Sequence, residues 1–573
     1  MPSRTRSVNF TAVSSSRRAA RWPALLLVPL CAALYGPGLF ALPAVDRDES
    51  RYTQAARQMV ASGDLVIPRI GSEARLIKPI GTYWLQAAAA RLSGSPDAIG
   101  VYRLPSALAA LAGVLCTYWI GRRFFAGAVA WLGAALLAAS ALLVVEAHLA
   151  TTDAMLLACV VVAQGCLAAL YEAVRRDLPP SPRAAAGFWI AQAAGVLVKG
   201  PVAPLVGALT IVTLMLTQRT IARRLFVALR PLWGLPLAAA CVAPWLVAAG
   251  MRIGWRALPA AMLADIVPKM VGGHQSHGGL PGLYLLMAPA TLWPGSLALA
   301  FALTMAWRRR RRPGERFLLA WLVPTWLFFE LLPTKLPNYV LPTFPAFALL
   351  AARAALSAPA RLRPPLRHPV TRLLVIGWAL LTLAIGVAPL VAARQLGASA
   401  ALGGAALAGL AAALIAALCL RYCGRGILAP AMWMAALGAV LVYAPLLQWT
   451  APQLDPLWMS RAAAAAVARA GIDRRLAAVG YAEPSLRFLT RSDLALIDAS
   501  AGAQFLIAHP SGLVFVAGDQ LPAFNAAAAE RGLALRNVWS ERGFNYSAGE
   551  WTDLHLLTTD STDRTDNREE TPR

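Results

Sequence analysis

The chain has 573 residues, of which 58% are hydrophobic and only 14% are charged. Because soluble domains usually carry about 25% charged residues, this composition excludes an ordinary soluble globular protein. The formal net charge of +25 would suit a nucleic-acid-binding protein, but the arginines lie mainly in short segments between apolar runs. Arginine in such loops sets topology and contacts anionic head groups, so we expect a multi-pass protein that binds membrane lipids and no nucleic acid.

Apolar runs that could cross a bilayer recur along the chain, since about 20 apolar residues span a hydrocarbon core of ~30 Å. The run from Trp22 to Leu42 is interpreted as the first span, because no small-residue cleavage site of a signal peptide follows it. The fifth and sixth runs are separated only by Lys199-Gly200-Pro201 and could form one broken hairpin. We predict thirteen spans, near residues 22–42, 103–120, 126–145, 154–172, 186–198, 201–217, 231–250, 283–306, 317–333, 339–356, 373–393, 401–420 and 427–448.

The distribution of arginine predicts the orientation of the chain. If the N-terminus is cytoplasmic, the arginine-rich segments all face the cytoplasm, and the short outer loops hold only Lys199, Lys335 and Arg394. The predicted regions are a cytoplasmic N-terminal segment at 1–21, an all-α transmembrane domain at 22–448 with long outer loops at 43–102 and 251–282, a periplasmic soluble domain at 449–557 and a disordered tail at 558–573.

The region after the last span has a different pattern. Short β-like runs ("LAAVGY", "GLVFVAG", "LHLLTT") alternate with helical ones such as "LPAFNAAAAERG", which predicts a small α/β domain. The stretch "GFNYSAGEW", residues 543–551, is typical of a tight aromatic hairpin, and we interpret it as structural.

Lysine is rare in this chain. Of 53 basic residues only four are lysines, and all four fall on the predicted outer side: Lys78, Lys199, Lys269 and Lys335. A compact ammonium group is a good partner for phosphate, so this placement indicates an anionic site. Chance within an arginine-rich composition is the alternative.

Acidic residues gather at the same predicted edge of the membrane: Asp46, Asp48, Glu49, Glu146 and Asp153. Ionisable groups at membrane depth are costly and usually mark function. For Asp153, which opens the fourth predicted span, helix capping is the alternative explanation.

The stretch "DRDESRYTQAARQMV", residues 46–60, follows the first span. Asp46 and Glu49 have the spacing of a capping box, which would explain that pair structurally. Asp48 and Arg51 are three residues apart and would share one helix face, so they can present an acid and a base together. Lys78 precedes Pro79, which favours an extended backbone at Lys78.

These residues carry a family resemblance. "DESRYTQAARQMVASGDLVIPRI…LIKPIGTYWL" resembles the first outer loop of the lipid A aminoarabinose transferases and the related protein O-mannosyltransferases, which are GT-C enzymes that use polyprenyl-phosphate sugars. The segments "EAHLATTDAMLLA", "VLVKGPVAPL", "GGHQSHGGLPGLYLL" and "PTKLPNYVLPTFP" follow in the expected order. The resemblance covers most of the spanning region and implies a GT-C transmembrane catalytic domain at 22–448.

The resemblance also implies roles for individual residues. Asp48 matches the catalytic carboxylate, and Asp153 matches a second essential acid. The residues that match the donor phosphate site are Arg51, Lys78, Lys335 and Tyr339. Further candidate contacts with donor or acceptor are Glu49, Lys199, His274 and His277.

One position departs from the aminoarabinose transferases. They carry a Glu immediately before the Lys-Pro, which resembles half of a metal site completed by a His of the second outer loop, whereas this chain has Ile77. His274 or His277 could still bind a divalent metal, with His274 the better candidate, but the carboxylate is missing and we expect no metal. The same change weakens the implication that the sugar is aminoarabinose.

The implied protein is a glycosyltransferase of the bacterial inner membrane, with its active site and C-terminal domain facing the periplasm. It would move a sugar, such as 4-amino-4-deoxy-L-arabinose or another pentose or hexose, from a polyprenyl phosphate to lipid A of lipopolysaccharide, to another glycan or to a protein, by a single inverting displacement. Two alternatives remain open: a protein O-mannosyltransferase-like enzyme, and a lipid-linked sugar transporter or flippase. Transporters often show internal repeats and midplane charges, and this sequence has no evident repeat.

Overall fold

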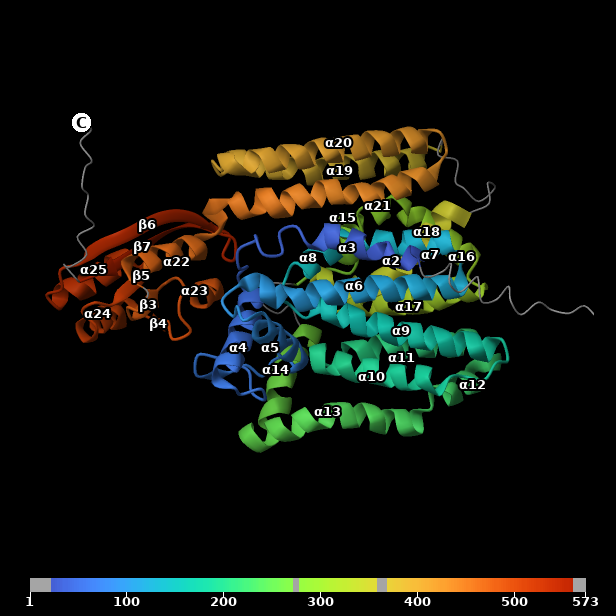
Figure 1. The fold of residues 1–573 in the computed structure, drawn as a ribbon, viewed down its shortest axis with the longest axis horizontal. Coiled ribbons are helices and arrows are strands. Elements are labelled where there is room, and N and C mark those ends of the chain that lie inside the picture. The colour runs from blue at the N-terminus through green and yellow to red at the C-terminus, as the bar shows by residue number, and fades with distance from the viewer. Residues whose placement is uncertain (1–21, 272–277, 358–367, 472, 560–573) are drawn as a thin grey trace, which may run out of the picture.

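The computed structural model describes residues 22–271, 278–357, 368–471 and 473–559. The molecule is elongated, with a bundle of long helices along most of its length and a small α/β domain at one end (Figure 1). The chain passes through the bundle first and reaches the α/β domain last, as the sequence predicts.

Within the described residues, seven helical segments are long and apolar enough to cross a membrane. They are α6 (Ile99–Phe124), α9 (Asp153–Arg175), α13 (Pro231–Ile253), η2 with α18 (Pro337–Leu356), α19 (Pro369–Gln395), η4 with α20 (Ser399–Gly424) and α21 with its continuation (Leu428–Gln453). Bent pairs of helices raise the number to nine when each pair counts as one span. The protein is therefore a multi-pass membrane protein, but the predicted number of thirteen spans is not confirmed.

The difference arises because hydropathy shows apolar length but not bends or breaks. α7 (Gly127–Ala138) meets α8 (Ala141–Ala147) at 60°, and α15 (Leu283–Thr291) meets η1 and α16 (Gly295–Arg308) at 118°. The first predicted span contains only the short helices α2 (Trp22–Leu25) and α3 (Leu27–Tyr35). The remaining apolar helices of the bundle are α10 (Pro182–Lys199), α11 (Val202–Thr217) and α17 (Pro313–Leu331).

The first outer loop is a folded unit at the end of the bundle that carries the α/β domain (Figure 1). It contains α4 (Asp48–Ser62), a hairpin of β1 (Arg69–Ile70) and β2 (Glu73–Ala74), and α5 (Gly81–Ser93). Beside it lies α14 (Ala257–Val271) of the second outer loop. The amphipathic, arginine-rich α12 (Arg219–Leu229) lies at the opposite end of the bundle.

A fully buried ion pair fastens this loop to the bundle. Arg103 of α6 donates from Nε and Nη2 to the two carboxylate oxygens of Glu49, at 2.8 and 2.7 Å. The same oxygens accept the backbone N–H groups of Val45 and Ala150 at 2.9 and 2.8 Å. Arg103 also donates to backbone carbonyls of the segment before α4, including that of Leu42 at 2.7 Å. Burial and complete hydrogen bonding make Glu49 a structural anchor.

The predicted capping box is wrong in detail. α4 begins at Asp48, and the residue before it, Arg47, makes no side-chain cap. The carboxylate of Asp46 instead accepts the backbone N–H of Ser485, in the α/β domain, at 3.0 Å. The acid that sequence spacing assigned to a local cap therefore makes a long-range contact.

The C-terminal domain is α/β, as predicted. Its five-stranded sheet has the order β4-β3-β5-β7-β6, in which β3 is parallel to β4 and β5, and β7 is antiparallel to β5 and β6. The strands are β3 (Leu476–Val479), β4 (Ala495–Ile497), β5 (Leu513–Ala517), β6 (Arg536–Asn545) and β7 (Glu550–Thr558). The helices are α22 (Met459–Ala470), α23 (Pro484–Leu489), α24 (Ala499–Ala508) and α25 (Leu521–Glu530). β6 and β7 form the hairpin predicted from "GFNYSAGEW".

Candidate active site

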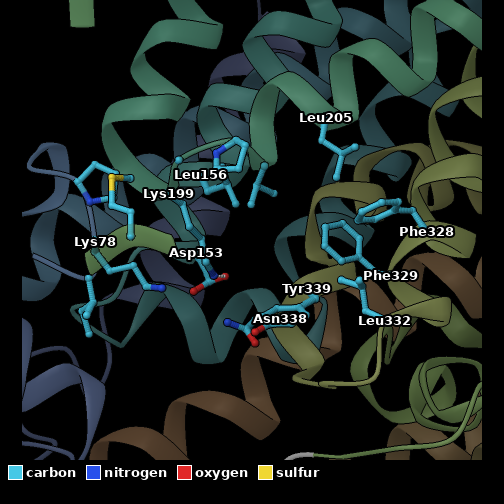
Figure 2. Close-up of a pocket in the computed structure, with 16 residues that line it drawn as sticks. Lys78, Asp153, Leu156, Lys199, Leu205, Phe328, Phe329, Leu332, Asn338 and Tyr339 are labelled. Carbon is cyan, nitrogen blue, oxygen red and sulfur yellow. Dashed lines mark hydrogen bonds and ion pairs between the residues drawn. The ribbon is translucent and has the colours of Figure 1, made fainter. Parts of the chain in front are cut away.

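A cavity lies where the first outer loop meets α14 and the ends of α9, α10, α11, α17 and η2. It encloses about 950 Å³, including its open mouth. Figure 2 shows polar side chains on one side and apolar side chains facing them across the cavity. The lining residues are Ile77, Lys78, Pro79, Asp153, Leu156, Lys199, Gly200, Pro201, Val202, Leu205, Met262, Phe328, Phe329, Leu332, Asn338 and Tyr339.

Asp153 and Lys199 form the charged centre of this cavity. Lys199 Nζ lies 2.6 Å from Asp153 Oδ1, and the ring of Tyr339 lies 5.6 Å from the same amine. Asp153 is the first residue of α9, where the helix dipole favours a negative charge, but its carboxylate bonds to Lys199 rather than capping the helix. The predicted alternative of a simple cap for Asp153 is therefore wrong.

Backbone geometry explains why Lys199 reaches this position. Gly200 has a φ of +65°, a conformation that L side chains rarely adopt, and it ends α10 directly after Lys199. Pro201 then leads into α11. The Lys-Gly-Pro sequence thus places an ammonium group at a sharp turn beside the cavity, and α10 and α11 are two separate helices.

Lys78 enters the same cavity from the first outer loop and extends toward Asp153 (Figure 2). Its place depends on how closely α5 approaches the end of α10. A Cβ at Gly81 would lie 2.7 Å from the carbonyl oxygen of Leu197, so a residue with a side chain would force the two helices apart. Gly81 in "KPIGTYW" therefore helps bring Lys78 and Lys199 to one cavity.

Asp48 lies near the cavity rather than in its wall. Its side chain is 65% exposed, and one carboxylate oxygen lies 3.7 Å from Arg75 Nη2. Arg75 also donates from Nε to the hydroxyl of Tyr83 at 3.1 Å. Burial raises the pKa of Tyr83 to about 12, so this hydroxyl stays protonated at neutral pH. Asp48 and Asp153 both interact electrostatically with Glu146 of α8, which places the two acids in one charged neighbourhood.

The other predicted site residues separate into three groups. Arg51 is half-buried in α4, one turn after Asp48, and does not line the cavity. Glu49 is the buried anchor already described and does not face the cavity. His274 and His277 lie outside the described residues, as does the side chain of Lys269.

Lys335 is close to the cavity but its amine is turned toward the backbone. Lys335 Nζ donates to the carbonyl oxygens of Glu330 and Leu332 at 2.6 and 2.7 Å, at the C-terminal end of α17. Cations are favoured at this end of a helix, where carbonyl groups lack partners. Lys335 therefore caps α17, while Tyr339, four residues later, lines the cavity.

A metal ion does not fit the described residues of this site. Ile77 lines the cavity at the position where the resembling enzymes carry a carboxylate, and its side chain has no donor atom. Within the described ranges, no cluster of three or more His, Cys, Asp or Glu side chains could hold an ion. We derive no step of the chemistry through a metal.

The sequence did not single out Arg75 or Asn338 as site residues, although each stood in a quoted segment. Arg75 begins "RLIKPIGTYWLQ", and Asn338 is the polar residue of "KLPNY". Asn338 lines the cavity next to Asp153 (Figure 2). Both residues lie inside segments that carry the family resemblance. Such a position alone does not distinguish a site residue from its neighbours.

A second, apolar cleft of about 1140 Å³ lies between α10, α11 and α13. Ala193 and Val196 of α10 line it, two turns or less before Lys199, and Pro204 of α11 lines it beside Leu205 of the first cavity. Gln192 is the one polar residue among the described residues that line this cleft. The same two helices therefore carry a charged cavity at the loop end and an apolar cleft further along the bundle.

One family model matches the first part of the chain, and relatives of known name match more than half of it. The family model for dolichyl-phosphate-mannose-protein mannosyltransferase matches residues 21–251. A Pseudomonas paraeruginosa protein named undecaprenyl phosphate-alpha-4-amino-4-deoxy-L-arabinose arabinosyl transferase is 31% identical over 351 residues, which cover 59% of this chain and 60% of that protein. The protein of the same name from Aeromonas salmonicida is 29% identical over 313 residues, covering 54% and 55%. The match thus spans little more than half the length of these curated relatives.

Structural similarity extends over nearly the whole chain. The crystal structure of ArnT from Cupriavidus metallidurans bound to undecaprenyl phosphate has a TM-score of 0.75 at 20% identity, and the match covers 95% of this chain and 99% of that one. The apo structure of the same protein gives 0.73, with 94% and 98% covered. The chain therefore has the GT-C fold of ArnT, with its C-terminal α/β domain, and resembles the aminoarabinose transferases and the protein mannosyltransferases in sequence.

Proposed function

We propose that the protein is a membrane glycosyltransferase that moves a sugar from a polyprenyl phosphate donor to lipid A or another extracytoplasmic acceptor. The observation that carries this proposal is the cavity in which Lys78, Lys199 and Asp153 face an apolar wall. It supports binding of a molecule with an anionic head and a hydrocarbon tail. Similarity to a structure that holds undecaprenyl phosphate supports the same class of donor.

The two lysines suit the phosphate of such a donor. When the bond between the sugar C1 and the phosphate oxygen breaks, the electron pair leaves with the phosphate, and cations beside its oxygens stabilise the growing charge. Lys78 and Lys199 line the cavity and would supply these cations. Asp153, at 2.6 Å, keeps the Lys199 ammonium charged and oriented.

Asp48 is the proposed catalytic carboxylate. It is exposed near the cavity, where it can accept the proton of an acceptor hydroxyl as the acceptor oxygen attacks C1 from the face opposite the phosphate. Arg75 Nη2 lies 3.7 Å from this carboxylate and is the cation beside it. For an acceptor that is itself a phosphate, the carboxylate would stabilise positive charge at C1 instead.

The apolar cleft between α10, α11 and α13 suits the polyprenyl tail. Its position along the helices that end at Lys199 and begin after Pro201 would let one lipid place its phosphate in the cavity and its tail at membrane depth. Burial of apolar surface at about 25 cal/mol per Å² would then add to donor affinity.

The proposed location is the bacterial inner membrane with the site facing the periplasm. The cavity lies at the end of the bundle that carries the α/β domain, and arginine-rich α12 lies at the other end. Because arginine-rich loops stay in the cytoplasm, this arrangement supports an extracytoplasmic site.

The decisive experiment is transfer by the purified protein in detergent, with undecaprenyl-phosphate-linked aminoarabinose as donor and lipid A as acceptor. We expect sugar transfer without a sealed membrane, and a raised donor KM in Lys78→Ala. Donor binding without transfer, together with donor movement across proteoliposomes, would contradict the transferase and support the flippase.

The identity of sugar and acceptor needs a second measurement. Lipid A masses from cells with and without the chain should differ by the mass of the transferred sugar. Unchanged masses, with an active purified enzyme, would redirect the proposal to another glycan or a protein acceptor. The match to the protein mannosyltransferase model supports the protein acceptor as the second candidate.

A further inference from the structure

Two residues immediately before α4 bond to the α/β domain. The backbone N–H of Asp46 donates to the hydroxyl of Tyr546 at 2.8 Å, and the carboxylate of Asp46 accepts from the N–H of Ser485 at 3.0 Å. The guanidinium of Arg47 donates to the carbonyl of Ser547. The backbone that leads into α4 is thus held from outside the bundle.

The backbone at Arg47 needs such support. Arg47 has φ +65° and ψ −116°, and it is one of only a few non-glycine residues in the described chain with a positive φ. Such conformations persist where the surrounding contacts fix them, and they concentrate at functional sites. Tyr546 accepts the N–H of the residue before Arg47, and Ser547 accepts the guanidinium of Arg47 itself.

The structure that supplies these bonds is the tip of the β6–β7 hairpin, residues 546–549. Asn545 Oδ1 accepts the N–H groups of Ser547 and Ala548 at 3.0 and 3.2 Å, which fixes the turn. Asn545 Nδ2 donates to Glu483 at 3.1 Å. The ring of Trp458 packs edge-on against Tyr546, with centroids 6.1 Å apart. The hairpin tip is therefore a rigid surface rather than a loose turn.

In the sequence, Asp48 follows the two residues that bond to the α/β domain and precedes a residue that is fixed to the bundle. The next residue, Glu49, is held by the buried guanidinium of Arg103. Asp48 itself is 65% exposed, and one of its carboxylate oxygens lies 3.7 Å from Arg75. The position of the Asp48 carboxylate therefore depends on the backbone on either side of it as well as on this ion pair.

We propose that the hairpin tip of the α/β domain positions Asp48, with Tyr546, Asp46 and Arg47 acting as positioning residues through the backbone at the start of α4. This inference rests on the proposed function, in which Asp48 is the catalytic carboxylate. It assigns the C-terminal domain a part in the reaction itself, because a displaced Asp48 would meet the acceptor proton at a poorer distance and angle.

Loss of the hairpin contact should change kcat and the donor KM by different amounts. Lys78 and Lys199 are carried by the segment before α5 and by the end of α10, and both line the cavity. Loss of the contact should lower kcat about tenfold to a hundredfold, the usual effect of a misplaced catalytic group, while the donor KM stays within about twofold. A purely structural role would lower the yield of folded protein without this separation.

The test compares Tyr546→Phe with Ser500→Ala in the full chain. Tyr546→Phe removes the hydroxyl that accepts from Asp46, whereas the hydroxyl of Ser500 accepts from Arg531 inside the α/β domain. The first measurement is hydrogen–deuterium exchange, which needs no substrate. We expect faster exchange at residues 46–52 in Tyr546→Phe, by about tenfold, and wild-type exchange there in Ser500→Ala.

The second measurement is turnover with undecaprenyl-phosphate-linked aminoarabinose and lipid A. Asp46→Asn keeps an oxygen that can accept from Ser485 and should retain most of kcat, whereas Asp46→Ala should lose it as Tyr546→Phe does. Unchanged exchange at residues 46–52 in Tyr546→Phe, or an unchanged kcat in an active protein, would overturn the inference. An inactive wild type that shows the expected exchange difference would instead contradict the proposed function and leave the positioning contact supported.

Discussion

Two buried acid–base pairs lie at the loop end of the bundle, and they differ in how completely they are satisfied. The carboxylate of Glu49 accepts four hydrogen bonds, from two nitrogens of Arg103 and two backbone N–H groups, and is fully enclosed. The carboxylate of Asp153 pairs with Lys199 at 2.6 Å and accepts a hydroxyl at 3.2 Å, and both residues open onto a cavity.

The two ion pairs differ in the way that separates a structural ion pair from one that faces a candidate site in a membrane protein. Both pairs carry ionisable groups at the membrane edge, where charge is costly. Because the Glu49 carboxylate makes all its hydrogen bonds inside the protein, we interpret that pair as a structural element. The Asp153 pair faces a cavity, and we propose a role in the chemistry for it.

Arg103→Ala should have the largest effect, on folding. It leaves the buried carboxylate of Glu49 without its partner, and breaking such a pair costs about 3–5 kcal/mol. We expect a strong fall in the yield and thermal midpoint of the purified protein. The control is Arg224→Ala, which removes an exposed pair with Asp177 at the other end of the bundle and should cost less than ~1 kcal/mol. Equal losses in the two variants would contradict the anchor role.

Asp48→Asn should have the next largest effect, on turnover. Loss of a proton acceptor in the reaction lowers kcat by about a thousandfold, equivalent to ~4 kcal/mol. Because Asp48 is 65% exposed, the thermal midpoint should remain within error of the wild type. Asp97→Asn is the matched control, since Asp97 is 85% exposed in the same outer loop and pairs with Arg57. Near-normal turnover in Asp48→Asn would remove Asp48 from the chemistry.

The sequence predicted the charged cavity better than it predicted the anchors. The resemblance and the rarity of lysine both indicated Lys78 and Lys199, and these residues line one cavity with Asp153 and Tyr339. Residue type was informative here because an amine at the membrane edge needs a specific partner.

Predictions from sequence spacing were wrong where the hydrogen-bond partner of a residue was distant in the chain. Asp46 and Glu49 fitted a local capping box, but their partners are Ser485 and Arg103. The span count failed for a related reason: hydropathy gives apolar length, whereas bends of 60° and 118° depend on tertiary packing. Local patterns predict elements well and predict long-range contacts only where a family resemblance supplies them.

Lys199→Met and Lys335→Met should have different effects on donor affinity and on stability, although the rarity of lysine indicated an anionic site for both. Lys199 faces the cavity, so its loss should weaken binding of undecaprenyl phosphate by about ten- to a hundredfold, the range for one charged hydrogen bond. Lys335 donates to the carbonyls at the end of α17, so its loss should lower the thermal midpoint with little change in affinity. A large affinity loss in Lys335→Met would show that its amine turns to the phosphate when donor binds.

Asp46 should give the smallest effect, as a dependence of stability on pH. Burial beside the α/β domain raises the pKa of Asp46 from 3.8 to about 6, with the charge of Glu483 adding to the shift and hydrogen bonds from Ser485 and Tyr546 opposing it. The folded protein therefore holds this proton more tightly than the unfolded chain does. The resulting stabilisation is complete below about pH 4 and is lost as pH rises through 6.

Asp46→Asn keeps the acceptor for Ser485 and removes the titrating proton. The difference in thermal midpoint between wild type and variant should therefore change by a few degrees between pH 4 and pH 7, with the wild type relatively more stable at the acidic end. Above pH 7 the variant should be at least as stable as the wild type, because it no longer buries a charge near Glu483. A difference that is constant with pH would mean that Asp46 is solvated in the folded protein and that the hairpin tip does not close over it.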